Sequence, residues 1–267
     1  MLQEERIVCY DKELDIEAYR FRGLLQKFPN HFHEYYVIGF IESGARKMTC
    51  RNQEYILGSG DIVLFEPLAT HTCEPLDGQA LDYRCLNIKN SVMERLVAEI
   101  TGSSRLPRFS EPVLYRSEQV SVLQELHQMI MAKTEGFCKE EYLYFLIVQL
   151  LAQPQAEAAP ATAASAVQTA AEYLEQHYAE GISLDDLAAL VGSNKYSLLR
   201  GFTRAKGITP YRYLQALRIS AAKKLLEAGT QPLETALTVG FADQSHFTNV
   251  FKECIGLTPG QYRTIFC

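Results

Sequence analysis

Three histidines and a cysteine in the first third of the chain have side chains that could hold a metal ion or a polar ligand. His31 and His33 are separated by one residue, and His71 and Cys73 follow at the same spacing further along. Residues i and i+2 of an extended strand lie on one face, so His31 and His33 would project together. Imidazole and thiolate groups are donors that suit zinc and other borderline metals.

We favour a different use of these histidines, in which they hydrogen-bond a small effector molecule and no cofactor is bound. Tyr36 and Arg84 complete this expected effector site. An arginine on a barrel strand could bind a carboxylate of the effector. A metal ion held by the three histidines and the cysteine remains the alternative.

The elements that would position these side chains are short strands. Residues 7–90 are rich in Val, Ile, Tyr, Phe and Thr, and turn signals interrupt them at roughly ten-residue spacing. Examples of these signals are Gly58-Ser59-Gly60-Asp61 and Asp77-Gly78. The pattern predicts an antiparallel barrel or sandwich over residues 1–90.

The composition changes again after the predicted strands. Residues 91–152 have helical spacing, and they are expected to pack on the barrel or to pair two subunits. Residues 153–165 are mostly small and include two prolines, which predicts a linker. Residues 166–267 have helical patterns throughout. The expected fold is therefore a two-domain α+β protein, with a β-barrel followed by helices and an all-α C-terminal domain.

The charges are divided unevenly between the two halves. The whole chain has 26 Lys and Arg against 32 Asp and Glu, a net charge of -6, but residues 166–267 hold ten basic and nine acidic residues. A bulk architectural DNA-binding protein would need a strongly basic domain, so this class is excluded. Sequence-specific DNA binding by a nearly neutral domain is not excluded.

The C-terminal half contains an internal repeat with an offset of 48 or 49 residues. The matched positions are Gly192 and Gly240, Phe202 and Phe251, Gly207 and Gly256, Thr209-Pro210 and Thr258-Pro259, and Tyr213 and Tyr262. Each copy is typical of a helix-turn-helix unit, whose second helix is expected at residues 194–206 or 244–254. A helix of about 28 Å from Thr209 to Ala228 would join the copies. It would place the two second helices near successive major grooves, about 34 Å apart.

The residues of this repeat resemble the AraC/XylS-type DNA-binding domain, over about residues 167–266. The first half shows Leu184-x2-Leu187-Ala188 and Tyr196-x-Leu198-x-Arg200-x-Phe202, and the second shows Gly240-Phe241-x2-Gln244-x-His246-Phe247 and Thr258-Pro259-x2-Tyr262-Arg263. The resemblance implies a transcriptional regulator that binds double-stranded promoter DNA and acts as a homodimer. It also implies contact with RNA polymerase if the regulator is an activator.

The resemblance also implies roles for single residues of the helix-turn-helix units. Base edges in the major groove would be read by Tyr196, Arg200, Gln244, Ser245 and Asn249. The DNA backbone would be contacted by Lys195, Arg204, Lys206, Arg212, His246, Lys252 and Arg263. Gly201 departs from the family pattern, because a helix-forming residue is expected there and glycine costs up to about 1 kcal/mol inside a helix.

The N-terminal half resembles the cupin-like sensor domain of many AraC-type regulators. The resemblance rests on His31-x-His33 and on Gly60-Asp61 with the later Pro67 and His71, and it covers about residues 18–90. An enzymatic cupin would normally carry a glutamate shortly after the histidine pair, where this chain has Val37 and Ile38. This departure argues against catalysis and favours a regulator that senses a small-molecule effector. The alternative is a metal-binding cupin sensor or enzyme with an appended DNA-binding domain.

The cysteines and the apolar stretches of the sequence predict where in the cell the protein is located. Seven cysteines with no Cys-x-x-Cys pair argue against a disulfide framework and predict a reducing, cytoplasmic location. The N-terminus lacks the apolar core of a signal peptide. The longest apolar stretch, residues 142–152, is about half the ~20 residues of a membrane span, so no membrane partner is expected.

Overall fold

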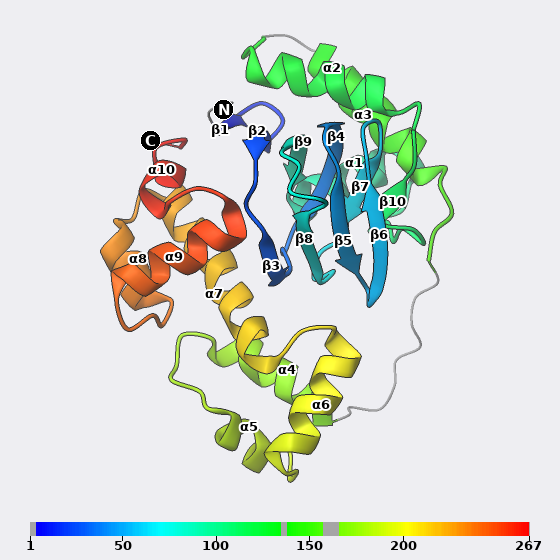
Figure 1. The fold of residues 1–267 in the computed structure, drawn as a ribbon. Coiled ribbons are helices and arrows are strands. Elements are labelled where there is room, and N and C mark those ends of the chain that lie inside the picture. Colours follow the sequence, from blue (N-terminus) through cyan, green and yellow to red (C-terminus); the bar gives the residue numbers. More distant parts are fainter. Residues whose placement is uncertain (1–3, 135–137, 157–165, 267) are drawn as a thin grey trace. The chain divides into compact units, whose positions relative to one another are not determined.

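The computed structural model describes residues 4–134, 138–156 and 166–266 (Figure 1). Contacts between residues divide the chain into two compact units. The first unit comprises residues 1–27, 33–69 and 73–158, and the second comprises residues 28–32, 70–72 and 159–267. The second unit thus holds the C-terminal helices together with two short pieces of the strand-rich half.

The strands of the described residues form two sheets, of six and four strands. The larger has the order β1-β2-β9-β4-β7-β10, with antiparallel neighbours, and the smaller has the order β3-β8-β5-β6. The strands are Glu5–Asp11 (β1), Ile16–Leu24 (β2), Phe28–His31 (β3), Tyr36–Ser43 (β4), Arg46–Cys50 (β5), Gln53–Leu57 (β6), Ile62–Phe65 (β7), His71–Pro75 (β8), Leu81–Ile88 (β9) and Val113–Leu114 (β10). The antiparallel β architecture predicted from the turn spacing is present.

The alternation of side chains along each strand gives the larger sheet two distinct faces. Cross-strand partners share a face, and Ile38 of β4 is paired with Leu86 of β9. Both belong to a buried core that includes Leu123, Leu126 and Ile130. The helices packed on this face are α1 (Asn90–Thr101), α2 (Val120–Met131) and α3 (Cys138–Leu151).

The strand β10 comes from outside the predicted barrel. It pairs with β7 through Val113 with Val63 and Leu114 with Ile62. The sequence predicts only helices over residues 91–152, because a strand of two residues is too short to show alternation.

The C-terminal helices have the predicted organisation of two helix-turn-helix units joined by a long helix. They are α4 (Ala166–His177), α5 (Leu184–Leu190), α6 (Lys195–Lys206), α7 (Pro210–Glu227), α8 (Pro232–Thr238), α9 (Gln244–Ile255) and α10 (Pro259–Arg263). Ser183 and Asp186 form a capping box at the start of α5, and Pro210 follows the Thr209 cap of α7. The predicted two-domain α+β fold class is confirmed. In the parts of the chain that the structure describes, the helices are too short or too polar to cross a membrane.

The start of the predicted linker contacts the first unit. The amide of Ser110 donates to the carbonyl oxygen of Pro154 (3.1 Å), and the amide of Ala156 donates to that of Arg108 (2.6 Å). Residues 157–165 lie outside the described residues, so a linker over residues 153–165 stays a prediction.

Candidate functional site

The helix α6 separates its buried and exposed side chains clearly. Leu198 and Phe202 are buried in the core of the second unit. Tyr196 is 70% exposed, and Arg200 is also exposed. The two residues expected to read base edges therefore lie on the surface, on the side of the helix away from its core.

The helix α9 has the same division. Phe247 and Phe251 are fully buried, whereas Gln244, Ser245 and Asn249 are exposed. The five residues expected to read bases thus all lie at the surface of the second helix of their unit.

Side-chain caps and a glycine turn hold these helices in place. Asn194 accepts a hydrogen bond from the amide of Ser197 (2.8 Å), and Asp243 accepts one from the amide of His246 (2.7 Å). The turn before α9 contains Gly240, whose φ is 88°. A Cβ at this position would lie 2.4 Å from a backbone carbonyl oxygen, so any other residue would be both strained and obstructed.

The residues expected to contact the DNA backbone fall into two groups. The exposed group is Lys195, Arg204, His246 and Lys252. The other three are half-buried and contact the protein itself: Lys206 donates to Gln168, Arg212 lies 3.6 Å from the carboxylate of Glu253, and Arg263 donates to the carbonyl oxygen of Gly229. Lys195 of the exposed group also pairs with a protein side chain, Asp185 (3.2 Å), so it is exposure that makes the first group better placed to reach phosphate.

Gly201, the residue that departs from the family pattern, is not required by packing. A Cβ at this position would meet the side chain of Val167 at 3.7 Å, which is an ordinary van der Waals contact. Packing within the unit would therefore accommodate alanine, and nothing in the structure explains the glycine.

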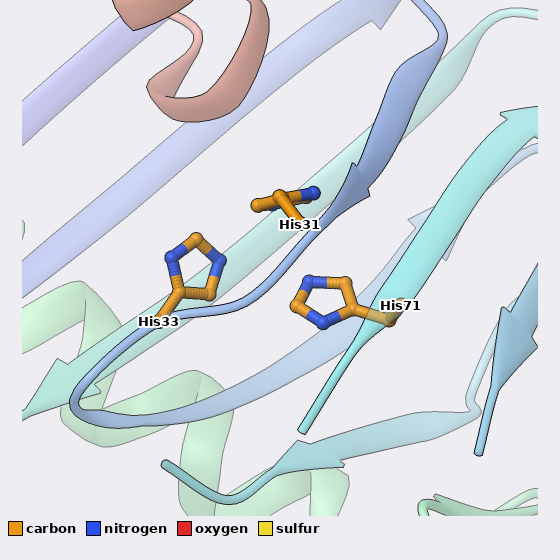
Figure 2. Close-up of side chains that lie close together, drawn as sticks. All are labelled: His31, His33 and His71. Atoms are coloured by element: carbon orange, nitrogen blue, oxygen red, sulfur yellow. The ribbon is translucent and has the colours of Figure 1, made fainter. Parts of the chain in front are cut away.

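Two of the predicted histidines, His31 and His71, lie close together in the strand-rich half of the chain (Figure 2). His31 ends the strand β3, His33 follows in the loop before β4, and His71 begins β8. The ring centroids of His31 and His71 are 4.4 Å apart. Cys73, the fourth predicted donor, is not grouped with them among the described residues. The paired histidines do not share a strand as predicted, because β3 ends at His31.

The protonation of the histidines follows from their surroundings. His31 and His71 are buried and His33 is half-buried. The Nδ1 atom of His31 lies 2.7 Å from the carbonyl oxygen of Pro29. A carbonyl oxygen can only accept a hydrogen bond, so Nδ1 carries the proton and Nε2 the lone pair. Burial lowers the pKa of His31 to about 4, so the ring is neutral at pH 7.

Tyr36 and Arg84, the other residues expected in the effector site, lie on the face of the larger sheet that packs on the helices. Tyr36 is part of that core, and its hydroxyl donates to the carbonyl oxygen of Pro107 (2.9 Å). Arg84 binds the carboxylate of Glu42 through two nitrogens, with Nε 2.9 Å from Oε2. Both side chains therefore have partners within the protein.

The opposite face of the larger sheet carries buried polar residues that the sequence analysis did not single out. The carboxylate of Glu17 accepts hydrogen bonds from the hydroxyl of Tyr19 (2.9 Å) and the amide of Asn87 (3.2 Å), and all three are buried. Tyr83 lies on this face too, close enough to Cys73 of β8 for the two to interact electrostatically. The polar face therefore turns toward the smaller sheet. The signal in the sequence is that Glu17 and Tyr19 alternate with apolar residues along a predicted strand.

Arg46 of β5 is a second buried polar group that the sequence analysis missed. It is fully buried, and its guanidinium donates to the carbonyl oxygens of Gln79 (3.1 Å) and Leu24. Its Nε atom has no hydrogen-bond partner, and no acidic side chain of the described residues forms an ion pair with it. A buried charge without an opposite charge is costly, so an anionic group would be stabilised beside it.

These features define a class of protein: a DNA-binding protein with two helix-turn-helix units and an antiparallel β domain with a polar interior. Residues 187–265 match the family model described as a helix-turn-helix domain. Residues 13–146 match the one described as an AraC-like ligand binding domain.

Similar proteins specify the family. The HTH-type transcriptional regulator YbfI of Bacillus subtilis (strain 168) is 49% identical over 249 residues, which cover 92% of this chain and 90% of that protein. The HTH-type transcriptional activator RhaS of Klebsiella pneumoniae (strain 342) is 26% identical, covering 88% of this chain and 87% of that protein. A crystal structure of an apo ToxT variant from Vibrio cholerae strain SCE256 has a similar fold, with a TM-score of 0.59 at 16% identity, over 97% of this chain and 100% of that one.

The chain belongs to the AraC family of HTH-type transcriptional regulators. Its N-terminal domain is the ligand-binding domain and its C-terminal domain binds DNA. The predicted family and the predicted class of function are confirmed.

Proposed function

We propose that the protein recognises its operator mainly through α6, with Tyr196 and Arg200 at base edges. The observation that carries this proposal is the exposure of both side chains on the helix whose Leu198 and Phe202 are buried. A guanidinium can donate two parallel hydrogen bonds to a guanine, which makes Arg200 the residue with the greatest discriminating power. The helix α9 would read a second site through Gln244, Ser245 and Asn249.

In this proposal the contacts to phosphate come from exposed side chains around the two helices. These are Lys195, Arg204, His246 and Lys252. Such contacts set the register of the protein on the duplex but carry no sequence information. The near-neutral charge of the C-terminal half supports a mode in which base reading contributes much of the discrimination.

The strand-rich domain would bind a small-molecule effector on its buried polar face. Glu17, Tyr19, Tyr83 and Asn87 supply hydrogen-bonding groups there, and Arg46 supplies a charge that lacks an opposite partner. The effector would shift the population between arrangements that engage the operator and arrangements that do not. The relative RhaS is named a transcriptional activator, which supports activation with RNA polymerase as a further partner.

A homodimer formed through α3 is part of the same proposal. Phe145 is 53% exposed and Val148 is 44% exposed, three residues apart on this helix. Beside them a groove of about 470 Å³ lies between α2 and α3, with Val122 and Tyr142 in its lining. A second copy related by a two-fold axis would cover the same apolar stripe on both subunits.

The protein would act without catalysis and in the cytoplasm. YbfI and RhaS are both named as transcriptional regulators, which supports a non-enzymatic role. Val37 and Ile38, at the place of the glutamate of an enzymatic cupin, are buried apolar residues. A cytoplasmic location is inferred because the proposed partner is promoter DNA.

The test of the DNA-reading proposal begins with selection of tightly bound duplexes from a random pool by the full chain. Arg200→Ala should then weaken binding to the selected duplex by about 10- to 100-fold and relax the preference at one base pair. The control is Arg105→Ala, an exposed arginine of the first unit whose loss changes the charge equally. Unchanged affinity and unchanged preference in Arg200→Ala would refute the assignment of α6.

A further inference from the structure

We propose that Arg218 of α7 is a positioning residue that fixes the separation of the two reading helices, α6 and α9. The inference rests on the proposed function, because it takes these helices as the ones that read bases. It adds a second source of specificity, in which the protein selects the spacing between two base-reading sites as well as the bases. Arg218 is 7% exposed, so it acts through the protein and not by touching DNA.

Arg218 ties the helix that joins the two copies to the beginning of the first copy. Its Nε donates a hydrogen bond to the carbonyl oxygen of Tyr178 (2.7 Å), and its Nη2 donates one to that of Glu180 (2.8 Å). Both carbonyl groups belong to the segment between α4 and α5, which leads into the first helix-turn-helix unit. A guanidinium is planar and its donors have fixed directions, so the two bonds hold this segment in one orientation.

The second helix-turn-helix unit contacts the same segment. A Cβ at Gly240, in the turn between α8 and α9, would lie 2.4 Å from the carbonyl oxygen of Ala179, so the two backbones meet here. The Cζ of Arg218 lies 5.7 Å from the ring centroid of Phe241, within the range of a cation–π interaction. Phe241 is buried, and its ring centroid is 5.2 Å from that of Phe247 in α9.

One side chain therefore contacts both helix-turn-helix units. Residues 178–180 are held between α7 and the turn before α9, so a movement of α9 relative to the first unit has to disturb the hydrogen bonds of Arg218 or the contact at Gly240. A buried guanidinium that loses its hydrogen-bond partners is costly. The arrangement of the two units is therefore expected to be stiff.

A stiff arrangement makes the spacing of the DNA sites matter. Each additional base pair moves a site by about 3.4 Å along the duplex, and by about 35° around it because one turn holds about 10.5 base pairs. A hydrogen bond to a base edge is about 3 Å long, so a side chain that reads one base pair cannot follow this displacement. Loss of Arg218 should let α9 rotate relative to α6 and follow the displaced site.

The experiment uses the full chain and the selected duplex. Arg200→Ala and a Gln244→Ala, Asn249→Ala double variant identify the base pairs that α6 and α9 read, and one base pair is inserted between them. The natural chain should bind the inserted duplex at least about tenfold more weakly than the selected one. Arg218→Met keeps the apolar stem but removes both hydrogen bonds, so the two duplexes should bind with nearly equal affinity.

The ratio of the two affinities separates positioning from stability and from charge. A general loss of stability would weaken both duplexes by the same factor and leave the ratio unchanged. Lys224→Met removes a positive charge from an exposed position of α7 and should also leave the ratio unchanged. Arg218→Lys keeps the charge without the two fixed donors, so its ratio should fall as in Arg218→Met. This milder variant carries the test if Arg218→Met has no cooperative unfolding transition.

Three results would overturn the proposal. They are equal binding of both duplexes by the natural chain, an unchanged ratio in Arg218→Lys, and a selected duplex in which the α9 variant relaxes no preference. The role of α6 is judged separately, because Arg200→Ala relaxes a base preference whatever Arg218 does. A relaxed preference in Arg200→Ala together with an unchanged ratio in the Arg218 variants would count against Arg218 alone.

Discussion

At the scale of single residues, a buried histidine links the stability of the strand-rich domain to pH. His127 of α2 is fully buried, and its Nε2 lies 2.9 Å from the carbonyl oxygen of Tyr19. Its Nδ1 has no partner. Burial is the main cause that lowers its pKa to about 4, helped by Arg84 and Arg20 and opposed by Glu42 and the hydrogen bond to Tyr19.

The depressed pKa predicts a loss of stability in acid. The pKa is about 4 in the folded chain against 6.5 when unfolded, so the unfolded state binds the proton between these values. The contribution of neutral His127 to the free energy of unfolding is fully present above pH 6.5 and is lost as the pH falls toward 4. Between pH 7 and pH 5 the free energy of unfolding should therefore fall by about 2 kcal/mol. Urea unfolding followed by circular dichroism should show a weaker pH dependence in His127→Gln than in the natural chain. If the free energy of unfolding changed equally with pH in the two proteins, the assignment of this pH dependence to His127 would be contradicted.

At the scale of elements, the helix α3 has two faces with different roles. Leu143, Leu146 and Ile147 are buried in the core beneath the larger sheet. Phe145 lies between Leu143 and Leu146 in sequence, Val148 follows Ile147, and both are exposed. An apolar stripe on a helix already anchored by its other face is suited to pairing with a second copy.

A charge on this stripe should prevent dimer formation. Phe145→Glu places a carboxylate where two copies would meet, so light scattering after size-exclusion chromatography should show a monomer where the natural chain is a dimer. Ile56→Glu is the matched control, because Ile56 is also exposed (52%) but lies on β6. A monomeric natural chain, or a dimer that survives Phe145→Glu, would rule out this interface.

At the scale of the whole molecule, the two units have separate hydrophobic cores. Leu126 and Ile147 represent one core, and Leu198 and Phe202 represent the other. Units that bury their own apolar surface fold independently more readily than units that share one core. The chain passes into the second unit for the last time after residue 158, and residues 28–32 and 70–72 of the strand-rich half also belong to that unit.

Cleavage of the chain within residues 157–165 is therefore expected to leave two folded pieces. A protease site inserted within residues 157–165 would allow cleavage of the purified protein. The C-terminal piece should keep the sequence preference of the full chain, with affinity lower by about 100-fold because the dimer no longer holds two copies together. A C-terminal piece that loses its cooperative unfolding transition would show that the proposed domain boundary is misplaced.

The local signals of the C-terminal half are sufficient to predict its architecture. Capping by Ser183 and Thr209 and the end of α6 at Gly207 involve residues within one turn of the helix boundary. The repeat in the sequence then implies two similar units. Interactions of such short range depend little on the rest of the fold, so sequence patterns report them well.

The ligand-binding half depends on contacts between distant residues, which local patterns do not contain. Alternation shows that Tyr36 and Val37 point to opposite faces of β4, but only the packing of the helices decides which face is the core. Tyr36 and Arg84 of the predicted site lie on the face that packs on the helices, and Glu17 and Asn87 lie on the opposite face. The convergence of His31 with His71 likewise requires β3 and β8 to be neighbours in a sheet, a pairing that no local interaction specifies.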